Sequence, residues 1–220
     1  MVDEYRGTAL VLRRDEIDTD QIVSAEHCKR ITRDGYADVL FSQWRQDPDF
    51  ALNQQDAAAA AVLIAGHNFG TGSSREHAVW ALRDWGFSVV IASSFGDIFR
   101  RNAIRNGLVP VQLLPRPLSQ LADLVDAKPG MSLRVSVIER KVRAGDLEWP
   151  FGLDDRSRRL LLDERDEITA AEASEPAIAA FEKARSCWLP DLAKPTKPCR
   201  TPTHAAARWG QTHKRMDINE

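Results

Sequence analysis

Short apolar runs alternate with amphipathic stretches through the first half of the chain. The apolar runs predict strands at residues 7–13, 60–66, 88–93 and 108–114. The amphipathic stretches predict helices at about residues 74–85, 97–106 and 117–125. Strands that alternate with helices at this spacing are typical of βαβ units with right-handed crossovers. The pattern therefore predicts an α/β fold with a partly parallel central sheet flanked by helices.

Glycine and proline indicate how some of these elements end. Gly86 and Gly107 follow two of the predicted helices, where a left-handed residue commonly ends a helix. Pro110 lacks the N–H that a central strand requires, so residues 108–114 are expected to form an edge or irregular strand.

The remaining patterns are less regular. Residues 131–151 alternate as two strands would around Arg143, Ala144 and Gly145, which predicts a hairpin. Helices are predicted at about residues 153–162 and 169–184. Residues 24–33 are ambiguous, with a helix favoured.

The last 35 residues differ in composition from the rest of the chain. Residues 186–220 contain four prolines and scattered basic residues, a composition typical of a poorly ordered tail. The alternative is a segment that clasps a partner subunit. The sequence thus predicts one domain at residues 1–185 and a tail at residues 186–220.

Charge and hydropathy exclude several classes of protein. The formal net charge is -2, whereas a nucleic-acid-binding protein usually carries a basic surplus. No apolar run approaches the roughly 20 residues that span a bilayer. The charged start of the sequence lacks the apolar segment of a secretory signal. We therefore expect a cytoplasmic protein with neither a nucleic acid nor a membrane as partner.

The cysteines do not form a motif. Cys28, Cys187 and Cys199 lie far apart, with no Cys-x-x-Cys pair. A disulfide framework, or a zinc or iron–sulfur site built by this chain alone, is not expected.

A polar loop between an apolar strand and a helix carries the candidate chemistry. It reads His-Asn-Phe-Gly-Thr-Gly-Ser-Ser-Arg-Glu-His over residues 67–77. The N–H groups that open a helix attract an anion. Arg75 adds a planar fork that matches a carboxylate. The loop therefore suits an anion such as a carboxylate or a phosphate.

Two structural interpretations of this loop stay open. Ser73 and Glu76 are spaced as a capping box, with Ser73 as N-cap. His77 is more readily explained as a structural histidine than as a metal ligand. The Gly70-Thr71-Gly72 string is neither a dinucleotide-binding fingerprint nor a Walker A loop.

Longer strings resemble a known family. Phe-Gly-x-Gly-Ser-Ser-Arg-Glu-His, followed by Ala-x-Trp-Ala-Leu, resembles the signature of isopropylmalate isomerase small subunits, and aconitase swivel domains carry a similar string. Further similar segments are Asp-Thr-Asp-Gln-Ile at 18–22, residues 89–99, residues 106–111 and, more weakly, residues 151–154 and 181–182. The resemblance covers about residues 7–184 and leaves out the tail.

The resemblance implies a fold, a reaction and a partner. The fold would be the swivelling β/β/α domain of the aconitase C-terminal type. The reaction would be that of a hydro-lyase, which isomerises 2-isopropylmalate and 3-isopropylmalate in leucine biosynthesis by dehydration and rehydration. A large subunit would carry a [4Fe–4S] cluster, as a heterodimer or higher assembly with this chain, which would bind no cluster and be inactive alone.

The resemblance also assigns roles to individual residues. Ser73 matches the catalytic serine that acts as base. Ser74 and Arg75 match substrate-binding residues, with Arg75 on a carboxylate. The others expected to bind substrate are Asp20, Thr19, His27 and Arg30. A turn or cap carboxylate is an equal alternative for Asp20.

One departure from the family pattern affects the expected substrate. Where many relatives have an aromatic-aliphatic pair, this chain has His27-Cys28, which weakens a hydrophobic pocket for an isopropyl group. Methylmalate, homocitrate or citrate are therefore alternative substrates. A non-catalytic assembly or regulatory subunit is the alternative from another class of protein.

Overall fold

The computed structural model describes residues 3–30, 32–54, 57–162, 172 and 174–185. The chain divides into two compact units, Met1–Asp166 and Glu167–Glu220. The described part of the second unit consists mainly of one helix, α7 (Glu175–Ala184), which confirms part of the helix predicted at 169–184. The predicted tail, residues 186–220, lies outside the described residues. None of the helices in the described part is long and apolar enough to cross a membrane.

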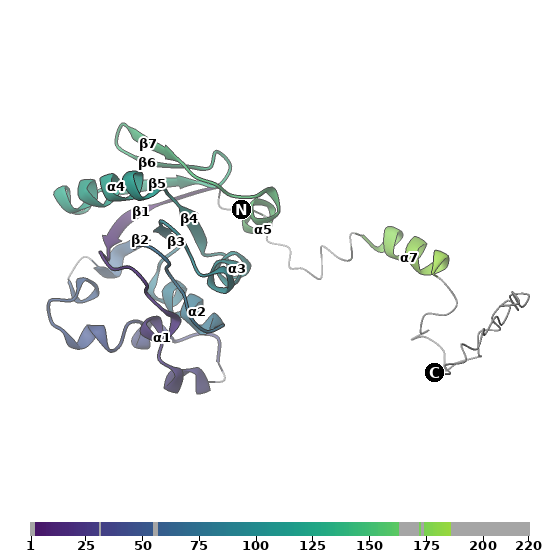
Figure 1. The fold of residues 1–220 in the computed structure, drawn as a ribbon, viewed down its shortest axis with the longest axis horizontal. Coiled ribbons are helices and arrows are strands. Elements are labelled where there is room, and N and C mark those ends of the chain that lie inside the picture. Colours follow the sequence, from purple (N-terminus) through teal and green to yellow (C-terminus); the bar gives the residue numbers. More distant parts are fainter. Residues whose placement is uncertain (1–2, 31, 55–56, 163–171, 173, 186–220) are drawn as a thin grey trace, which may run out of the picture. The chain divides into compact units, whose positions relative to one another are not determined.

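A seven-stranded sheet organises the first unit (Figure 1). Its strands are β1 (Glu4–Val11), β2 (Ala60–Ile64), β3 (Val89–Ala92), β4 (Val109–Gln112), β5 (Ser132–Ser136), β6 (Lys141–Ala144) and β7 (Leu147–Pro150). Their order across the sheet is β4-β3-β2-β1-β5-β6-β7. The first four strands run parallel to one another, and β5 to β7 add an antiparallel extension. The predicted partly parallel sheet is confirmed, and β4 with its proline is an edge strand as expected.

Helices cover both faces of this sheet. The helices of the first unit are α1 (Thr19–Ile22), α2 (Glu76–Trp85), α3 (Asp97–Arg105), α4 (Pro115–Ala127) and α5 (Asp155–Leu162). Leu63 of β2 packs with α1, α2 and α3 on one face, while Val62 and Ile64 pack with α4 on the other. The side chains of a strand alternate between faces, so the continuous apolar run of β2 fits a strand that is buried on both sides.

A short 3-10 helix, η1 (Ala25–Lys29), lies where a helix was favoured for residues 24–33. Further 3-10 helices follow before β2: η2 (Ala37–Val39), η3 (Trp44–Gln46), η4 (Ala51–Asn53) and η5 (Ala57–Ala59). This long connection between β1 and β2 contributes Tyr36, Leu40 and Phe41, all fully buried, to the core beneath α2. Tertiary packing of these side chains, rather than helical periodicity, sets its course.

The segment 131–151 holds three strands, so the prediction of two strands was wrong. The chain reverses once after Ser136, where the Ser136 hydroxyl accepts the Glu139 N–H at 3.1 Å and Arg140 takes a left-handed φ of +56°. It reverses again at Gly145, with φ +59°, as the sequence predicted. The first reversal was missed because it contains no glycine or proline.

Replacing Gly70 by alanine tests how tightly the loop after β2 packs. An added Cβ would lie 2.2 Å from Phe99 Cγ, and the φ of Gly70 is +73°. We expect G70A to lower the free energy of unfolding by roughly 2–5 kcal/mol, from overpacking and a left-handed backbone together.

The matched control is G130A. Gly130 has a similar φ of +79° but no atom within 4 Å of its added Cβ. This variant should lose only the backbone contribution, about 1–2 kcal/mol. Equal losses in urea unfolding of the two variants would contradict the packing argument.

Candidate active site

Three connections meet where the parallel strands end. They are residues 17–20 after β1, residues 67–75 after β2 and residues 94–96 after β3. The carboxyl ends of parallel strands share one edge of the sheet, where ligands of α/β proteins commonly bind. The Thr19 N–H donates to the Thr71 carbonyl at 2.9 Å, and the Phe69 N–H donates to the Ser94 carbonyl at 3.0 Å. Backbone hydrogen bonds thus hold the middle connection from both sides.

Ser73 lies exposed in the middle connection. Gly70 and Gly72 before it have φ values of +73° and +92°, in the left-handed region that favours glycine. The carbonyl of Ser73 accepts the Arg75 N–H at 2.9 Å. The Ser73 hydroxyl lies 3.5 Å from that of Thr19. The chain therefore presents this hydroxyl at the sheet edge.

The capping interpretation of Ser73 was wrong. Helix α2 begins at Glu76, its N-cap is Arg75, and no side chain caps it. The capping box instead opens α1, where Asp18 and Gln21 exchange hydrogen bonds of 2.8 and 2.9 Å. The Ser73 hydroxyl therefore does not cap helix α2.

An ion pair fixes Arg75 next to this serine. Its guanidinium contacts the carboxylate of Asp20, which also accepts the Ala25 N–H. The hydrogen bond from Arg75 holds the pKa of the Asp20 carboxyl below its ordinary value, and Asp20 in turn raises the pKa of Arg75. Only 18% of the Arg75 side chain is exposed. The ion pair therefore holds the guanidinium in one place.

The predicted site residues divide into two groups. Ser73, exposed Ser74, Arg75, Asp20 and buried Thr19 come together at the sheet edge. For His27 and Arg30, no contact with the Ser73 loop is found within the described residues.

The side chains of His27 and Arg30 are engaged elsewhere. Arg30 makes two hydrogen bonds of 2.9 Å to Asp38. His27 lies 3.4 Å from the carboxylate of Glu26. Their contact with substrate stays a prediction from the sequence.

Cys28 packs against the core on the face of the sheet that α2 covers, where it is half-buried. Its thiol lies 3.9 Å from the Ser24 carbonyl.

His77 is a packing residue, as the sequence favoured. Its ring lies 5.5 Å from that of Tyr36 and 4.7 Å from that of Trp80. Within the described ranges, no group of three or more His, Cys, Asp or Glu side chains is placed to hold a metal ion.

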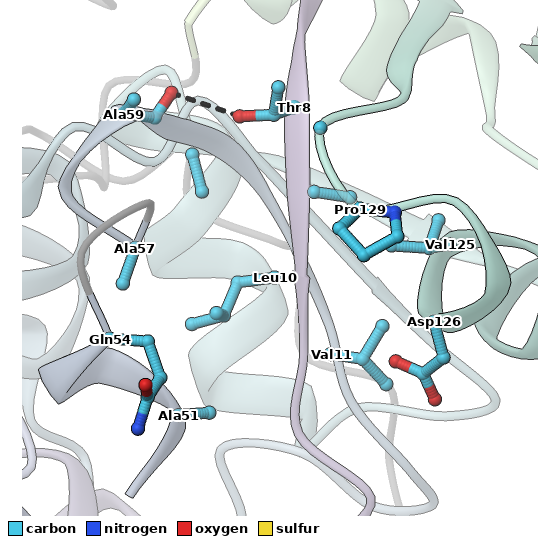
Figure 2. A pocket seen from close by; sticks show the side chains of 13 residues that line it. Thr8, Leu10, Val11, Ala51, Gln54, Ala57, Ala59, Val125, Asp126 and Pro129 are labelled. Atoms are coloured by element: carbon cyan, nitrogen blue, oxygen red, sulfur yellow. Dashed lines mark hydrogen bonds between the residues drawn. The ribbon is translucent and has the colours of Figure 1, made fainter.

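A cavity of about 420 Å³ beside β1 does not fit an acidic ligand (Figure 2). Its walls are mostly aliphatic, with Leu10, Val11 and Val125 among them. Its carboxylate, Asp126, pairs with Arg13 at 2.6 Å. A carboxylate at the wall repels a carboxylate ligand, and none of the residues grouped around Ser73 lines this cavity.

A second hollow of about 500 Å³ is rich in charge but includes none of the residues grouped around Ser73. It is lined by Arg33, Asp34, Trp80, Arg83, Asp84, Arg105 and Asn106. Arg83 already donates to the carbonyl of Asn106, and Arg33 stacks over Trp80 at 5.2 Å. The Ser73 loop therefore remains the better candidate for a reaction site.

Known proteins share both the sequence and the fold. Residues 1–116 match the Aconitase C-terminal domain family. The 3-isopropylmalate dehydratase small subunit of Salinispora tropica is 50% identical over 189 residues, 86% of this chain and 97% of that relative. The corresponding subunit of Salinispora arenicola is 48% identical over 188 residues, 86% and 96% of the two chains.

A solved structure supports the same fold. A crystal structure of 3-isopropylmalate dehydratase from Methanocaldococcus jannaschii has a TM-score of 0.59 at 24% identity, over 80% of this chain and 98% of that one. The predicted aconitase-type fold is thereby confirmed. This chain belongs to the family of 3-isopropylmalate dehydratase small subunits, which carry the aconitase C-terminal domain.

The Asp20–Arg75 pair gives a testable pH dependence. Because the folded pKa of Asp20 is lowered, the pair stabilises the fold above the ordinary carboxyl pKa of about 3.9 and loses this effect as pH falls through the folded value. Asp20 is 56% exposed, so D20N should cost at most about 1 kcal/mol near pH 7. Urea unfolding should show the difference from the parent shrink as pH falls below about 4 and vanish once the Asp20 carboxyl is protonated in the folded protein.

A matched control separates this site from surface pairing in general. Glu148 pairs with Lys141 at 2.6 Å on the β6–β7 hairpin, and its carboxyl pKa is also lowered. Both D20N and E148Q remove a paired carboxylate, but only D20N frees Arg75. If E148Q weakened substrate binding as much as D20N did, the anchoring role of Asp20 would be refuted.

Proposed function

We propose that this chain is the small subunit of a hydro-lyase that isomerises 2-isopropylmalate and 3-isopropylmalate in leucine biosynthesis. The observation that carries the proposal is Ser73, exposed on a glycine-rich loop beside the anchored guanidinium of Arg75. The 50% identity to a 3-isopropylmalate dehydratase small subunit supports the substrate. A cytoplasmic location stays a prediction from the sequence.

Ser73 acts as the base in this proposal. The Ser73 hydroxyl first gives its own proton to water. The resulting alkoxide takes a proton from the carbon next to the hydroxyl-bearing carbon, and the C–H electron pair becomes the double bond as hydroxide leaves. Water then adds back with the opposite regiochemistry. A neutral serine is a poor base, so the site must stabilise its oxyanion, as the positive start of α2 and the charge of Arg75 can do.

Arg75 and Ser74 hold the substrate. The guanidinium fork matches a carboxylate in two parallel hydrogen bonds, which orients the acid as well as binding it. Asp20 keeps the guanidinium in place. The exposed backbone of Ser74 lies between the base and this cation, so it borders the same ligand.

The partner is a large subunit, which the family's two-chain organisation implies. We infer that this subunit carries a [4Fe–4S] cluster, which would act as a Lewis acid on the leaving hydroxyl. The three cysteines of the chain lie far apart in the sequence with no Cys-x-x-Cys pair, so a cluster held by this chain alone is not expected. The contribution of this chain is therefore the base and the carboxylate clamp.

Reconstitution tests the proposed function. The chain is mixed anaerobically with a cluster-bearing large subunit and 3-isopropylmalate, and isopropylmaleate absorbance is followed. We expect a signal that needs both chains. A stable complex that turns over citrate, homocitrate or methylmalate instead would refute isopropylmalate as the substrate. A stable complex that is inactive on all these acids would refute the proposed hydro-lyase activity.

Replacing Ser73 by alanine tests the base. S73A should abolish turnover while the complex with the large subunit still forms, because the exposed side chain supports no core packing. S119A, which removes an exposed hydroxyl on α4, is the control and should match the parent. An S73A complex as active as S119A would assign the base to another residue.

Replacing Arg75 by lysine tests the clamp. R75K keeps the charge but loses the planar fork, so we expect KM to rise by about tenfold or more. Steady-state kinetics of the reconstituted pair measure this. An unchanged KM would show that Arg75 acts only as a point charge or does not contact the substrate.

A further inference from the structure

We propose that Thr19 is a positioning residue for Ser73, which fixes its peptide group and supplies a hydrogen bond to its oxygen when the serine loses its proton. This inference rests on the proposed function, in which Ser73 is the base. It changes the role that the family resemblance suggested for Thr19, which was contact with the substrate.

The burial of Thr19 excludes that direct contact in this arrangement. Its exposure is 2%, whereas Ser73 lies open at the surface. Within the described residues, Thr19 and Ser136 are the buried members among the serines and threonines. Burying a hydroxyl costs free energy unless the hydroxyl forms a hydrogen bond. The hydrogen-bond partner of Thr19 therefore indicates its role.

The partner of the Thr19 hydroxyl is Ser73 itself. Thr19 Oγ1 donates to the Ser73 carbonyl at 3.0 Å and lies 3.5 Å from Ser73 Oγ. The same carbonyl accepts the Arg75 N–H at 2.9 Å. The Ser73 peptide group is thus held by two donors, although the glycines before it leave the loop backbone otherwise permissive.

Thr19 is itself rigidly placed. It is the first residue of α1, directly after the N-cap Asp18, whose capping box fixes the start of that helix. Its N–H donates to the Thr71 carbonyl at 2.9 Å. Ile17 and Ile22 on either side are fully buried in the core. Its hydroxyl can rotate, but its oxygen cannot move far.

This geometry lets the Thr19 hydroxyl donate to one acceptor while Ser73 is neutral and to another once Ser73 has lost its proton. In the resting enzyme the Thr19 proton lies on the bond to the Ser73 carbonyl, and the Ser73 hydroxyl can donate to Thr19 Oγ1. When Ser73 carries a negative charge, the Thr19 hydroxyl rotates and donates to Ser73 Oγ. No proton leaves Thr19. A hydrogen bond to a charged oxygen is shorter and stronger than a neutral one, so the bond favours the reactive form.

Three variants in the reconstituted complex with the large subunit test the proposal. T19V replaces the hydroxyl by a methyl group of similar size. T19S keeps the hydroxyl and loses the methyl group. S136A removes another buried hydroxyl, which accepts a backbone N–H at 3.1 Å in the antiparallel part of the sheet. S73A is measured beside them.

We expect T19V to lower kcat by about 10- to 100-fold with KM within about twofold, because the base is misplaced while the clamp is intact. T19S should recover most of kcat, and S136A should keep the kinetics of the parent. A T19V kcat within about twofold of the parent, beside an inactive S73A, overturns the positioning role alone. An active S73A overturns the base, and the positioning role with it.

A folding failure of T19V would not end the test. T19A and T19S both lack the methyl group and differ only in the hydroxyl, so their ratio of kcat isolates it. A ratio near one overturns the proposal. A kcat of T19S at least about tenfold above that of T19A supports it.

Discussion

The pairing of residues 17–19 with the loop after β2 is the constraint on which the site depends. The Gly70 N–H donates to the Ile17 carbonyl at 2.7 Å, and the Thr19 N–H donates to the Thr71 carbonyl at 2.9 Å. Two glycines make this loop permissive, so its own sequence would not keep Ser73 in one position. The hydrogen bonds from residues 17–19 hold the loop in place instead. The chemistry proposed for Ser73 thus relies on a segment that precedes it by about 50 residues.

Two consecutive residues, Thr19 and Asp20, each hold a different part of the site in place. Thr19 points inward to the Ser73 peptide group, and Asp20 points outward to the guanidinium of Arg75. Successive residues of a helix point about a quarter-turn apart, so the first turn of α1 can hold a base and a cation at once. The capping box at Asp18 keeps that turn in place. The short length of α1 is compatible with this role because its ends are fixed by tertiary contacts.

The exposure of Ser73 and Ser74 also bears on the partner. A base that faces water gains little from nearby charges, because water screens them. A surface that closes over the loop would exclude water and strengthen the effect of Arg75 on a developing oxyanion. The cavities beside β1 and between α2 and α3 do not include these serines. The proposed reaction therefore depends on the large subunit for more than its cluster.

The sequence by itself determined the strands and helices around β2, β3 and β4, the partly parallel sheet and the loop that carries Ser73. These follow from local periodicity and from a motif within one stretch of chain. It also indicated Asp20 and Arg75, but not that they pair. Only the tertiary structure decided that Ser73 is not a helix cap, that Thr19 is buried against it, and that residues 131–151 hold a third strand. The first two features depend on contacts between segments that are distant in the sequence, which local sequence patterns do not predict. The third depends on a turn that contains neither glycine nor proline, the residues by which turns are usually predicted.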